Sequence, residues 1–454
     1  MNAKKILLQW TLPLLLFLGF YLLSYKLERV DTLPLIATYT VLFVVLWFWV
    51  RHCNHLFGIF FIGLVCRLLF SFHIPVLSQD FYRFIWDGNI QLLGINPYRF
   101  TPKDLIELIH FPNLDLLYQK MGSLSTENYS NYPPLSQYLF QLMAYFNRGE
   151  LLPSVLLLRG LYLLGELVLF WTGVKLLKRV ELPTAYLAWY FLNPLVVVEG
   201  FGNLHGESLM MGFTALSWLY CLKRKWFFGG VFMALAIGTK LLPLLLVPFF
   251  FRYLGIQKFI AFGFVILGAS LLLWLPFWNS EMQVHYAETI KLWFTTFEFN
   301  GSIYNIIRAI GYEVKGYNII RKLGAITPYI TIGIVVLFSL IPRNREPLQL
   351  MQSMLFLLTC YFFMATTVHP WYIINLIFLG ILTGYAFPIV WSLTVFWSYS
   401  AYGIDLVEEQ PFWQLTGYGL VYCCFFYELI KGRLGYHLQK PNFFSTEFSP
   451  IASR

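Results

Sequence analysis

Long apolar runs recur along the whole chain and constrain its fold more than any other feature. Of the 454 residues, 58% are hydrophobic and 12% are charged, whereas a soluble domain carries about 25% charged residues. A run of roughly 20 apolar residues can cross a bilayer as a helix. The runs therefore predict an all-α, polytopic transmembrane bundle of about 12–14 spans. They lie near residues 6–24, 33–50, 56–74, 151–174, 183–201, 207–222, 226–238, 241–251, 259–277, 323–341, 348–366, 371–387, 388–403 and 412–430.

Two neighbouring runs, 226–238 and 241–251, are short for a span. Gly238 and Pro243 bracket Lys240 between them. We interpret the two runs as a broken pair of helices, because helix breaks at membrane depth usually line a cavity.

Positive charge is unevenly distributed between the predicted connections. If the N-terminus is cytoplasmic, the short cytoplasmic connections hold most of the lysines and arginines, and Lys26 and Arg29 are exceptions on the other side. This positive-inside pattern predicts that both termini are cytoplasmic. The net charge of +9 is thus an orientation signal, and nucleic acid is not an expected partner. The cytoplasmic residues are Arg51, Lys175, Lys178, Arg179, Lys223, Arg224, Lys225, Arg252, Lys258, Arg343, Arg345, Lys431 and Arg433.

The same orientation places two long loops, 75–150 and 278–322, outside the membrane. Residues 1–454 are predicted to form a single integral membrane domain carrying both loops. Leu135–Asn147 and Val284–Phe299 have amphipathic helical spacing, and either rest on the membrane surface or pack as ordinary loop helices. The six cysteines lack metal-binding spacing, so neither zinc nor disulfides are expected.

Polar side chains gather in five segments at the predicted outer ends of the spans, as expected for an external cleft roofed by loops. Asp80 lies where the third span leaves the membrane, and partial desolvation would raise its pKa toward the range of a general base. The alternative roles are a helix cap or a partner for Arg83. Asp87, seven residues later, is expected to pair with Arg83 or Arg99.

Several of these polar residues could hold an anionic ligand. Arg83, Arg99, Lys240, His205 and His369 could bind a phosphate, and Tyr82, Asp87 and Glu207 complete the candidate substrate-binding set. Within the predicted spans, Arg67, Arg159 and Glu166 are expected to form buried ion pairs.

Six segments carry a resemblance to a known family. "SQDFYRFIWDGNIQLLGINPYRFTP", "YPPLSQ", "NPLVVVEGFGNLHGESLMMGF", "AIGTKLLPLLLVP", "FNGSIYNIIR" and "TTVHPWY" occur in an order that resembles bacterial polytopic mannosyltransferases of glycosyltransferase superfamily C. The chain is similar to the mycobacterial polyprenol-phosphate-mannose-dependent enzymes, with a fainter likeness to the catalytic subunit of GPI mannosyltransferase I. The likeness covers about residues 75 to 375, most of the chain.

The resemblance implies a polyprenyl-phosphate-linked hexose, mannose, as donor. The sugar would pass with inversion to the hydroxyl of a glycan or lipid acceptor on the outer face of a bacterial cytoplasmic (inner) membrane. Asp80 maps onto the base of such enzymes. Because Phe81 and Tyr82 follow it, a metal-binding DxD motif is absent, and a divalent metal cofactor is left open without motif support.

Three other functions compete with this interpretation. A sugar or lipid transporter would place charges deep in many spans and would show an internal repeat. No internal repeat is evident in the sequence. A lipid-linked glycan polymerase or ligase would use a diphosphate-linked donor. A non-catalytic subunit of an envelope complex would not need Asp80.

Overall fold

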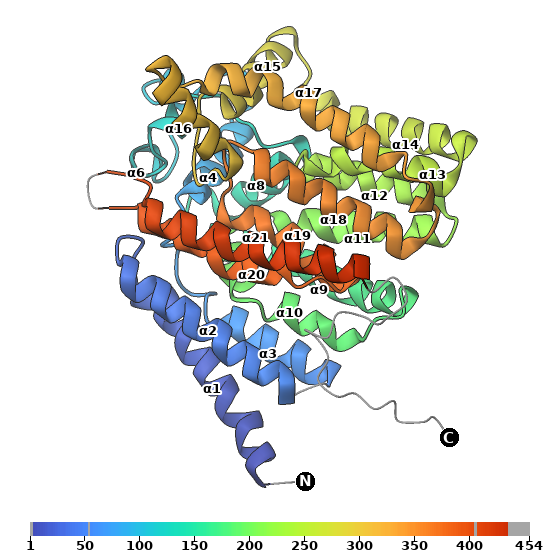
Figure 1. Ribbon diagram of the computed structural model, residues 1–454. Helices are drawn as coiled ribbons and strands as arrows, with labels where there is room; N and C mark the ends of the chain where they lie inside the picture. The colour runs from blue at the N-terminus through green and yellow to red at the C-terminus, as the bar shows by residue number, and fades with distance from the viewer. Residues whose placement is uncertain (1–2, 53–54, 404–405, 435–454) are drawn as a thin grey trace.

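The computed structural model describes residues 3–52, 55–403 and 406–434. Cys53, one of the six cysteines, and the side chains of Lys431 and Arg433 lie outside the described residues. Within the described part of the chain, the only extended pairings are two isolated bridges, Phe299 with Thr367 and Tyr402 with Val407. All other regular structure is helical (Figure 1). The predicted all-α polytopic bundle is therefore confirmed.

Helices long and apolar enough to cross a membrane form the body of the protein. Of the described helices, five meet this criterion, and α17 and α18 run side by side in Figure 1. They are α2 (Thr32–His52), α9 (Leu151–Arg179), α14 (Ile256–Trp274), α17 (Ile320–Ser339) and α18 (Pro347–Met364). The chain is thus a multi-pass membrane protein, and the count of 12–14 spans stays a prediction.

Shorter and broken helices complete the bundle. The apolar ones among them are α1 (Ala3–Tyr25), α3 (Leu56–Leu68), α12 (Trp226–Thr239), η3 (Leu242–Phe249) with α13 (Phe250–Leu254), and η6 (Pro370–Ile373) with α19 (Ile374–Thr383). The others are η1 (Thr184–Leu187), α10 (Ala188–Phe191), η2 (Val196–Gly202), α11 (Glu207–Leu222), η4 (Leu275–Phe277), η5 (Pro342–Arg345), α20 (Phe387–Thr394), η7 (Val395–Ala401) and α21 (Pro411–Leu434).

The run 183–201, predicted as one span, is interrupted. It begins as η1 and α10, breaks at Asn193–Pro194 and continues as η2, a π-helical turn. Pro194 has no N–H to continue a helix, and the Asn193 side chain accepts a hydrogen bond from the Leu195 N–H at 2.9 Å. Isolated π-helical turns are frequent at functional sites.

The predicted break at Lys240 is confirmed. Helix α12 ends at Thr239, Lys240 is extended (φ −151°, ψ 150°), and η3 begins two residues later. Pro243 lies in the first turn of η3, where its missing N–H leaves no bond unmade. The break therefore places a lysine between two apolar helices.

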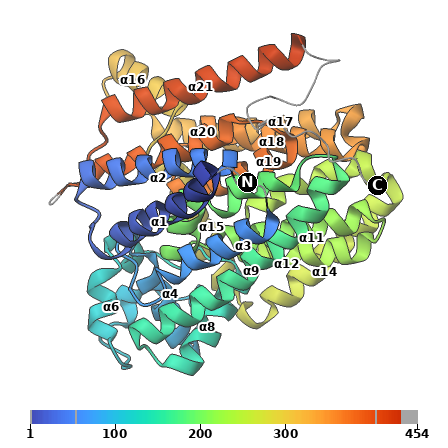
Figure 2. The ribbon, with the colours of Figure 1, turned by 90° about the horizontal axis from the view of Figure 1, so that it is seen from below.

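The first long loop is a compact layer of helices with its own apolar core. It comprises α4 (Asp80–Leu92), α5 (Pro102–Leu105), α6 (Leu114–Lys120), α7 (Ser123–Thr126) and α8 (Pro134–Asn147), which lie together at one end of the molecule in Figure 2. The Phe84 and Phe140 rings stack at 4.5 Å between α4 and α8. At this crossing a Cβ on Gly88 would lie 2.2 Å from the Phe140 carbonyl oxygen, so the close approach requires glycine.

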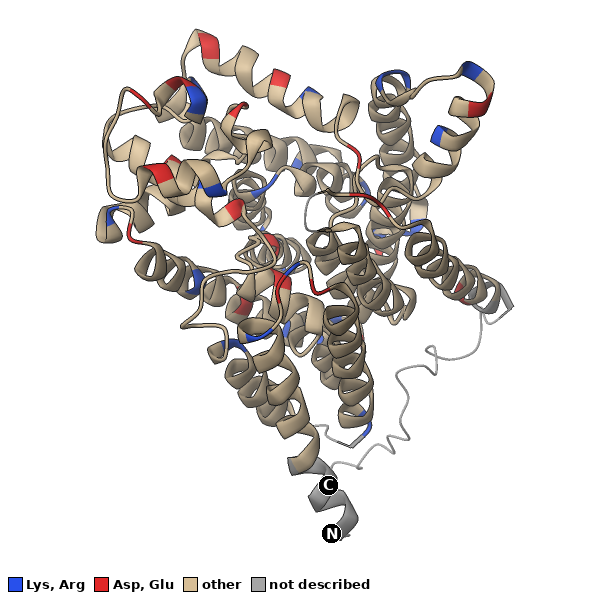
Figure 3. Cartoon of the chain, turned by 90° about the vertical axis from the view of Figure 1, so that its left-hand side faces the viewer, with Lys and Arg blue, Asp and Glu red and all other residues tan. Residues whose placement is uncertain are grey.

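The second long loop forms α15 (Ser280–Thr295) and α16 (Ile303–Lys315). Helix α15 begins four residues before the predicted start at Val284 and packs against α17. The helix predicted at Leu135–Asn147 is α8, which packs against α4. Figure 3 shows that charged residues lie largely on the loops and short helices, while the long helices are mostly uncharged.

Candidate active site

A cavity of ≈ 890 Å³ lies where the two loop regions meet the bundle. All five polar segments singled out in the sequence contribute to its lining, which confirms that they converge on one cleft. Six of the predicted site residues line it: Asp80, Arg83, His205, Glu207, Lys240 and His369.

Asp80 is the first residue of α4, and its carboxylate faces the cavity with 31% of the side chain exposed. Its backbone N–H donates to Ser78 Oγ at 3.2 Å, and the positive end of the α4 dipole favours a negative charge here. Burial by itself would raise the pKa of Asp80. The contact with His205 and the charges of His205 and Lys240 outweigh burial and hold the pKa below its ordinary value. The expected rise in pKa was therefore wrong, because the sequence did not show these neighbouring cations.

His205 is a cationic neighbour of Asp80. Its Nε2 lies 3.7 Å from Asp80 Oδ2, and its Nδ1 lies 3.2 Å from Glu199 Oε2. Burial would lower the pKa of His205, but the two carboxylates together raise it to about 9. The imidazole is therefore a cation at neutral pH, and it lies between the buried Glu199 and Asp80, which faces the cavity.

Glu199, on the π-helical turn η2, fixes the orientation of His205. Its side chain is fully buried, and its Oε1 accepts a hydrogen bond from the Tyr399 hydroxyl at 2.6 Å. Its Oε2 accepts from Asn203 Nδ2 at 3.1 Å. With both oxygens occupied, the carboxylate cannot turn away from the imidazole. Sequence reasoning missed Glu199, although an acid within an apolar run is itself a sign of function.

An aromatic column closes one wall of the cavity. The Trp371 ring stacks on His205 at 3.6 Å and on His369 at 4.3 Å. His369 also lies against Phe299, whose carbonyl accepts from the Val368 N–H at 2.8 Å. Burial, with the charges of His205, Arg29 and Lys240, lowers the pKa of His369 to about 3 in spite of the opposing charge of Asp80. His369 is therefore neutral at physiological pH.

Lys240 reaches the cavity from the helix break. Its ammonium pairs with Glu207 at the start of α11. Ser136, at the start of α8, donates to the Thr239 carbonyl at 2.8 Å, which ties the first loop to the broken helix pair. Lys240 is thus a cation of fixed position beside Asp80.

Arg83 and Asp87 hold the first loop together. Arg83 Nε lies 2.6 Å from Asp87 Oδ1, which confirms the predicted pairing. The same guanidinium donates to the Asn128 carbonyl at 2.9 Å, and Gln137 Nε2 donates to Asp87 Oδ2 at 2.9 Å. Arg83 uses its Nε and one terminal nitrogen in this network, while its other terminal nitrogen is buried without a partner among the described residues, and the residue lines the cavity.

Three predicted substrate-binding residues, Tyr82, Asp87 and Arg99, are not among the residues that line the cavity. Arg99 is half exposed and pairs with Glu281. Their binding roles stay predictions. Arg159, expected in an ion pair, instead donates to backbone carbonyls, at 2.5 Å for that of His73, and makes no ion pair with the acids that the structure describes.

One limb of the cavity is apolar. Leu244 of η3 and Ile332 of α17 both line it and are more than half exposed. Ile332 is twelve residues after the first residue of α17, which is about 18 Å along a helix. The cavity therefore joins a polar end at Asp80 to an apolar limb whose lining side chains are partly exposed.

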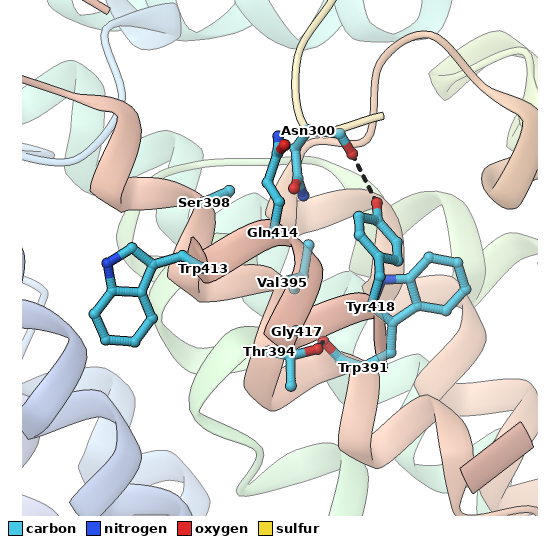
Figure 4. Close-up of a pocket in the computed structure, with 9 residues that line it drawn as sticks. All are labelled: Asn300, Trp391, Thr394, Val395, Ser398, Trp413, Gln414, Gly417 and Tyr418. Atoms are coloured by element: carbon cyan, nitrogen blue, oxygen red, sulfur yellow. Dashed lines mark hydrogen bonds between the residues drawn. The ribbon is translucent and has the colours of Figure 1, made fainter. Parts of the chain in front are cut away.

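A second, small pocket lies between η7 and α21. Its volume is ≈ 10 Å³, enough for about one water molecule. In Figure 4 the Tyr418 hydroxyl donates to the Asn300 carbonyl, at 2.7 Å, beside this pocket. The contact anchors the second loop, and the pocket is too small for a substrate. Among the described residues, no three His, Cys, Asp or Glu side chains gather as a metal site.

These features define a class: a multi-pass membrane protein in which the helices of two long loops close over a cavity with an acid at its polar end. The chain belongs to the family described as alpha-(1->6)-mannopyranosyltransferase, N-terminal domain, whose model matches residues 13–255, more than half of the chain. The resemblance to bacterial polytopic mannosyltransferases is thereby confirmed, and that to the GPI enzyme stays a prediction.

Individual relatives are distant and longer. Alpha-(1->6)-mannopyranosyltransferase A of Corynebacterium glutamicum is 24% identical over 208 residues, which are 44% of this chain and 41% of the relative. Alpha-(1->6)-mannopyranosyltransferase A of Mycobacterium tuberculosis is 23% identical over 177 residues, 39% of this chain and 33% of the relative. Alpha-(1->6)-mannopyranosyltransferase B of Corynebacterium glutamicum is 25% identical over 142 residues, which are 31% of this chain and 22% of the relative. The matched regions thus span less than half of each relative.

Proposed function

We propose that the protein is a membrane mannosyltransferase that moves mannose from a polyprenyl-phosphate carrier to an acceptor hydroxyl, with Asp80 as general base. One observation carries the proposal: a single cavity joins the partly buried carboxylate of Asp80 to an apolar limb lined by partly exposed residues of η3 and α17. A water-soluble nucleotide sugar would not need an apolar limb, whereas a lipid carrier does. The family and the names of the relatives support mannose as the sugar.

The transfer needs one base and no acid. The acceptor oxygen attacks the anomeric carbon, the bond from that carbon to the phosphate oxygen breaks, and the electron pair leaves with the phosphate. Asp80 takes the acceptor proton. Because a phosphate is a good leaving group, nothing has to protonate it, and nearby cations offset its growing charge. Lys240 and the imidazolium of His205 are in place to do so.

The low pKa of Asp80 is compatible with this role. As the bond to phosphate breaks, the anomeric carbon gains cationic character, and the attacking hydroxyl becomes acidic only as its new bond forms. A weak carboxylate base then suffices, as it does at oxocarbenium-like centres in glycosidases. Direct displacement inverts the anomeric carbon, so the α-linkage named in the relatives would require a β-linked donor.

The orientation follows from the charges at opposite helix ends. Helix α11 begins at the cavity with Glu207 and ends at Leu222, before Lys223, Arg224 and Lys225. Its 16 residues extend about 24 Å, most of the thickness of a bilayer core. By the positive-inside rule, this arrangement supports a cytoplasmic position for the three basic residues and a cavity at the outer face of a bacterial cytoplasmic membrane.

The test is mannosyl transfer by the full-length protein in membranes. Wild type, Asp80→Asn and Asp115→Asn, an exposed acid of the same loop, would be brought to equal levels and supplied with radiolabelled polyprenyl-phosphate mannose. We expect Asp80→Asn to lower the rate by about 100-fold or more and Asp115→Asn to leave it unchanged. Equal transfer by all three would remove Asp80 from the mechanism. Transfer from a nucleotide sugar but not from the lipid donor would refute the carrier.

A further inference from the structure

Arg29 is out of place by the positive-inside rule, and the structure shows where its side chain goes. The residue lies in the short connection between α1 and α2, on the side predicted to be outside. Its guanidinium lines the same cavity as Asp80 and stacks over the Tyr402 ring, with Cζ 3.3 Å from the ring centroid. The exception in the charge pattern is therefore a cavity residue.

Arg29 differs from the other cations of the cavity in having no acidic partner. Arg83 pairs with Asp87, Lys240 pairs with Glu207, and His205 lies between Glu199 and Asp80. No Asp or Glu that the structure describes lies within 4.0 Å of the Arg29 guanidinium. Its Nε is buried and has no hydrogen-bond partner among the described residues. Leaving such a donor unmet costs free energy, which an incoming anion would recover.

A row of aromatic rings links Arg29 to His369. Tyr402, on which Arg29 stacks, lies 5.6 Å from the Phe299 ring, and Phe299 lies 5.1 Å from the His369 ring. Lys240 lines the same cavity. The Nδ1 of His369 is buried without a partner in the described part of the chain. An anion at this position would therefore meet an unpaired guanidinium, a fixed ammonium and a neutral imidazole at once.

We propose that Arg29, with Lys240 and His369, forms a subsite for the phosphate group of a lipid substrate. A guanidinium presents its N–H groups in a planar fork that fits two phosphate oxygens, and stacking on Tyr402 holds that plane in place. The apolar limb lined by η3 and α17 would hold the lipid chain. The inference rests on the proposed function for the donor, but a phospholipid acceptor would carry the same phosphate chemistry.

Binding, measured without sugar transfer, separates these cases. Purified full-length protein in lipid nanodiscs would be titrated with farnesyl phosphate, with farnesol and with a short-chain phosphatidylglycerol. Wild type would be compared with Arg29→Gln, Arg29→Lys and the control Arg148→Gln, whose arginine is exposed and is not among the residues that line the cavity. Arg29→Lys keeps the positive charge but loses the planar guanidinium that fits two phosphate oxygens. It replaces Arg29→Gln in the comparison if Arg29→Gln does not fold.

We expect farnesyl phosphate to bind wild type more tightly than farnesol. Arg29→Gln should weaken the binding of farnesyl phosphate by roughly 10- to 100-fold, Arg29→Lys should weaken it by less, and Arg148→Gln should leave it unchanged. If the Arg29 variants lose affinity for phosphatidylglycerol alone, the subsite belongs to the acceptor. Equal affinities in wild type and both Arg29 variants, or no preference of wild type for phosphate over alcohol, would overturn the proposal. If binding depends on Arg29 while no mannose is transferred, the subsite stands and the proposed function fails.

Discussion

Glu199 lies on the π-helical turn η2 and Glu166 of α9 lies beside that turn, yet the two acids belong to acid–base pairs of different kinds. A Cβ on Gly200, the residue after Glu199, would lie 3.3 Å from Glu166 Oε1. Glu166 pairs with Arg67, and neither side chain is exposed. Glu199 holds His205, which in turn faces the partly exposed Asp80.

The difference lies in the cation and in its access to the cavity. Arg67 is charged at every relevant pH, and it also donates to the Gly63 and Phe191 carbonyls at 2.8 and 2.9 Å, so its pair joins α3 to α9 and α10 as a fixed clamp. His205 can change charge, and its partner Asp80 faces the cavity of ≈ 890 Å³. A sealed pair with a permanent cation stabilises the fold, whereas an open pair with a titratable cation can take part in chemistry.

The largest effect on stability is expected at the sealed pair. Glu166→Ala would leave the Arg67 guanidinium buried without its acid and lower the free energy of unfolding by about 3–5 kcal/mol. Thermal unfolding of the purified protein in detergent would measure this, with Glu281→Ala as the exposed control. Glu166→Ala protein that keeps its melting temperature but loses activity would place Glu166 in the site instead.

Glu199→Gln should act on the pH dependence rather than on folding. Without the buried carboxylate, the pKa of His205 would fall from about 9. His205 would then carry less positive charge beside Asp80. The pH–rate profile of mannosyl transfer should therefore narrow from both sides, with the larger loss at alkaline pH. A profile of unchanged shape at a lower rate would mean that Glu199 only packs.

Wild type itself should show a broad pH plateau. Asp80, whose pKa is lowered, is ionised above its pKa, so activity should fall only below the ordinary carboxyl range near about 3.9. His205 is protonated below its pKa of about 9 and loses its charge above it, so activity should decline as the pH rises through 9. Initial rates between pH 4 and 10 would show this, and a base-type inflection near pH 6–7 would contradict the assignment.

The smallest effect is expected at Arg99. Its pair with Glu281 is half exposed on both sides, so Arg99→Gln should change stability by about 0–1 kcal/mol and leave the KM for the donor unchanged. A large increase in KM would show that the outer loops close further over the substrate and bring Arg99 to it.

Local features were predictable because they depend on short stretches of sequence. The apolar runs predicted an all-α membrane bundle, and Lys240 between Gly238 and Pro243 predicted the helix break. Asp87 was predicted to pair with Arg83 or Arg99, and it pairs with Arg83. The convergence of five polar segments on one cleft also followed, because the alternation of apolar runs assigns each segment to one side of the membrane.

Only the tertiary structure decided which of these groups meet. It brought Glu199 to His205 and His205 to Asp80, reversed the expected direction of the Asp80 pKa, and turned Arg29 into the cavity while leaving Arg99 outside it. A pKa and an ion pair depend on distances of a few ångströms between side chains from distant segments, such as Asp80 and His205. Apolar periodicity determines which helices form and on which side their ends lie, but the packing of those helices determines the distances.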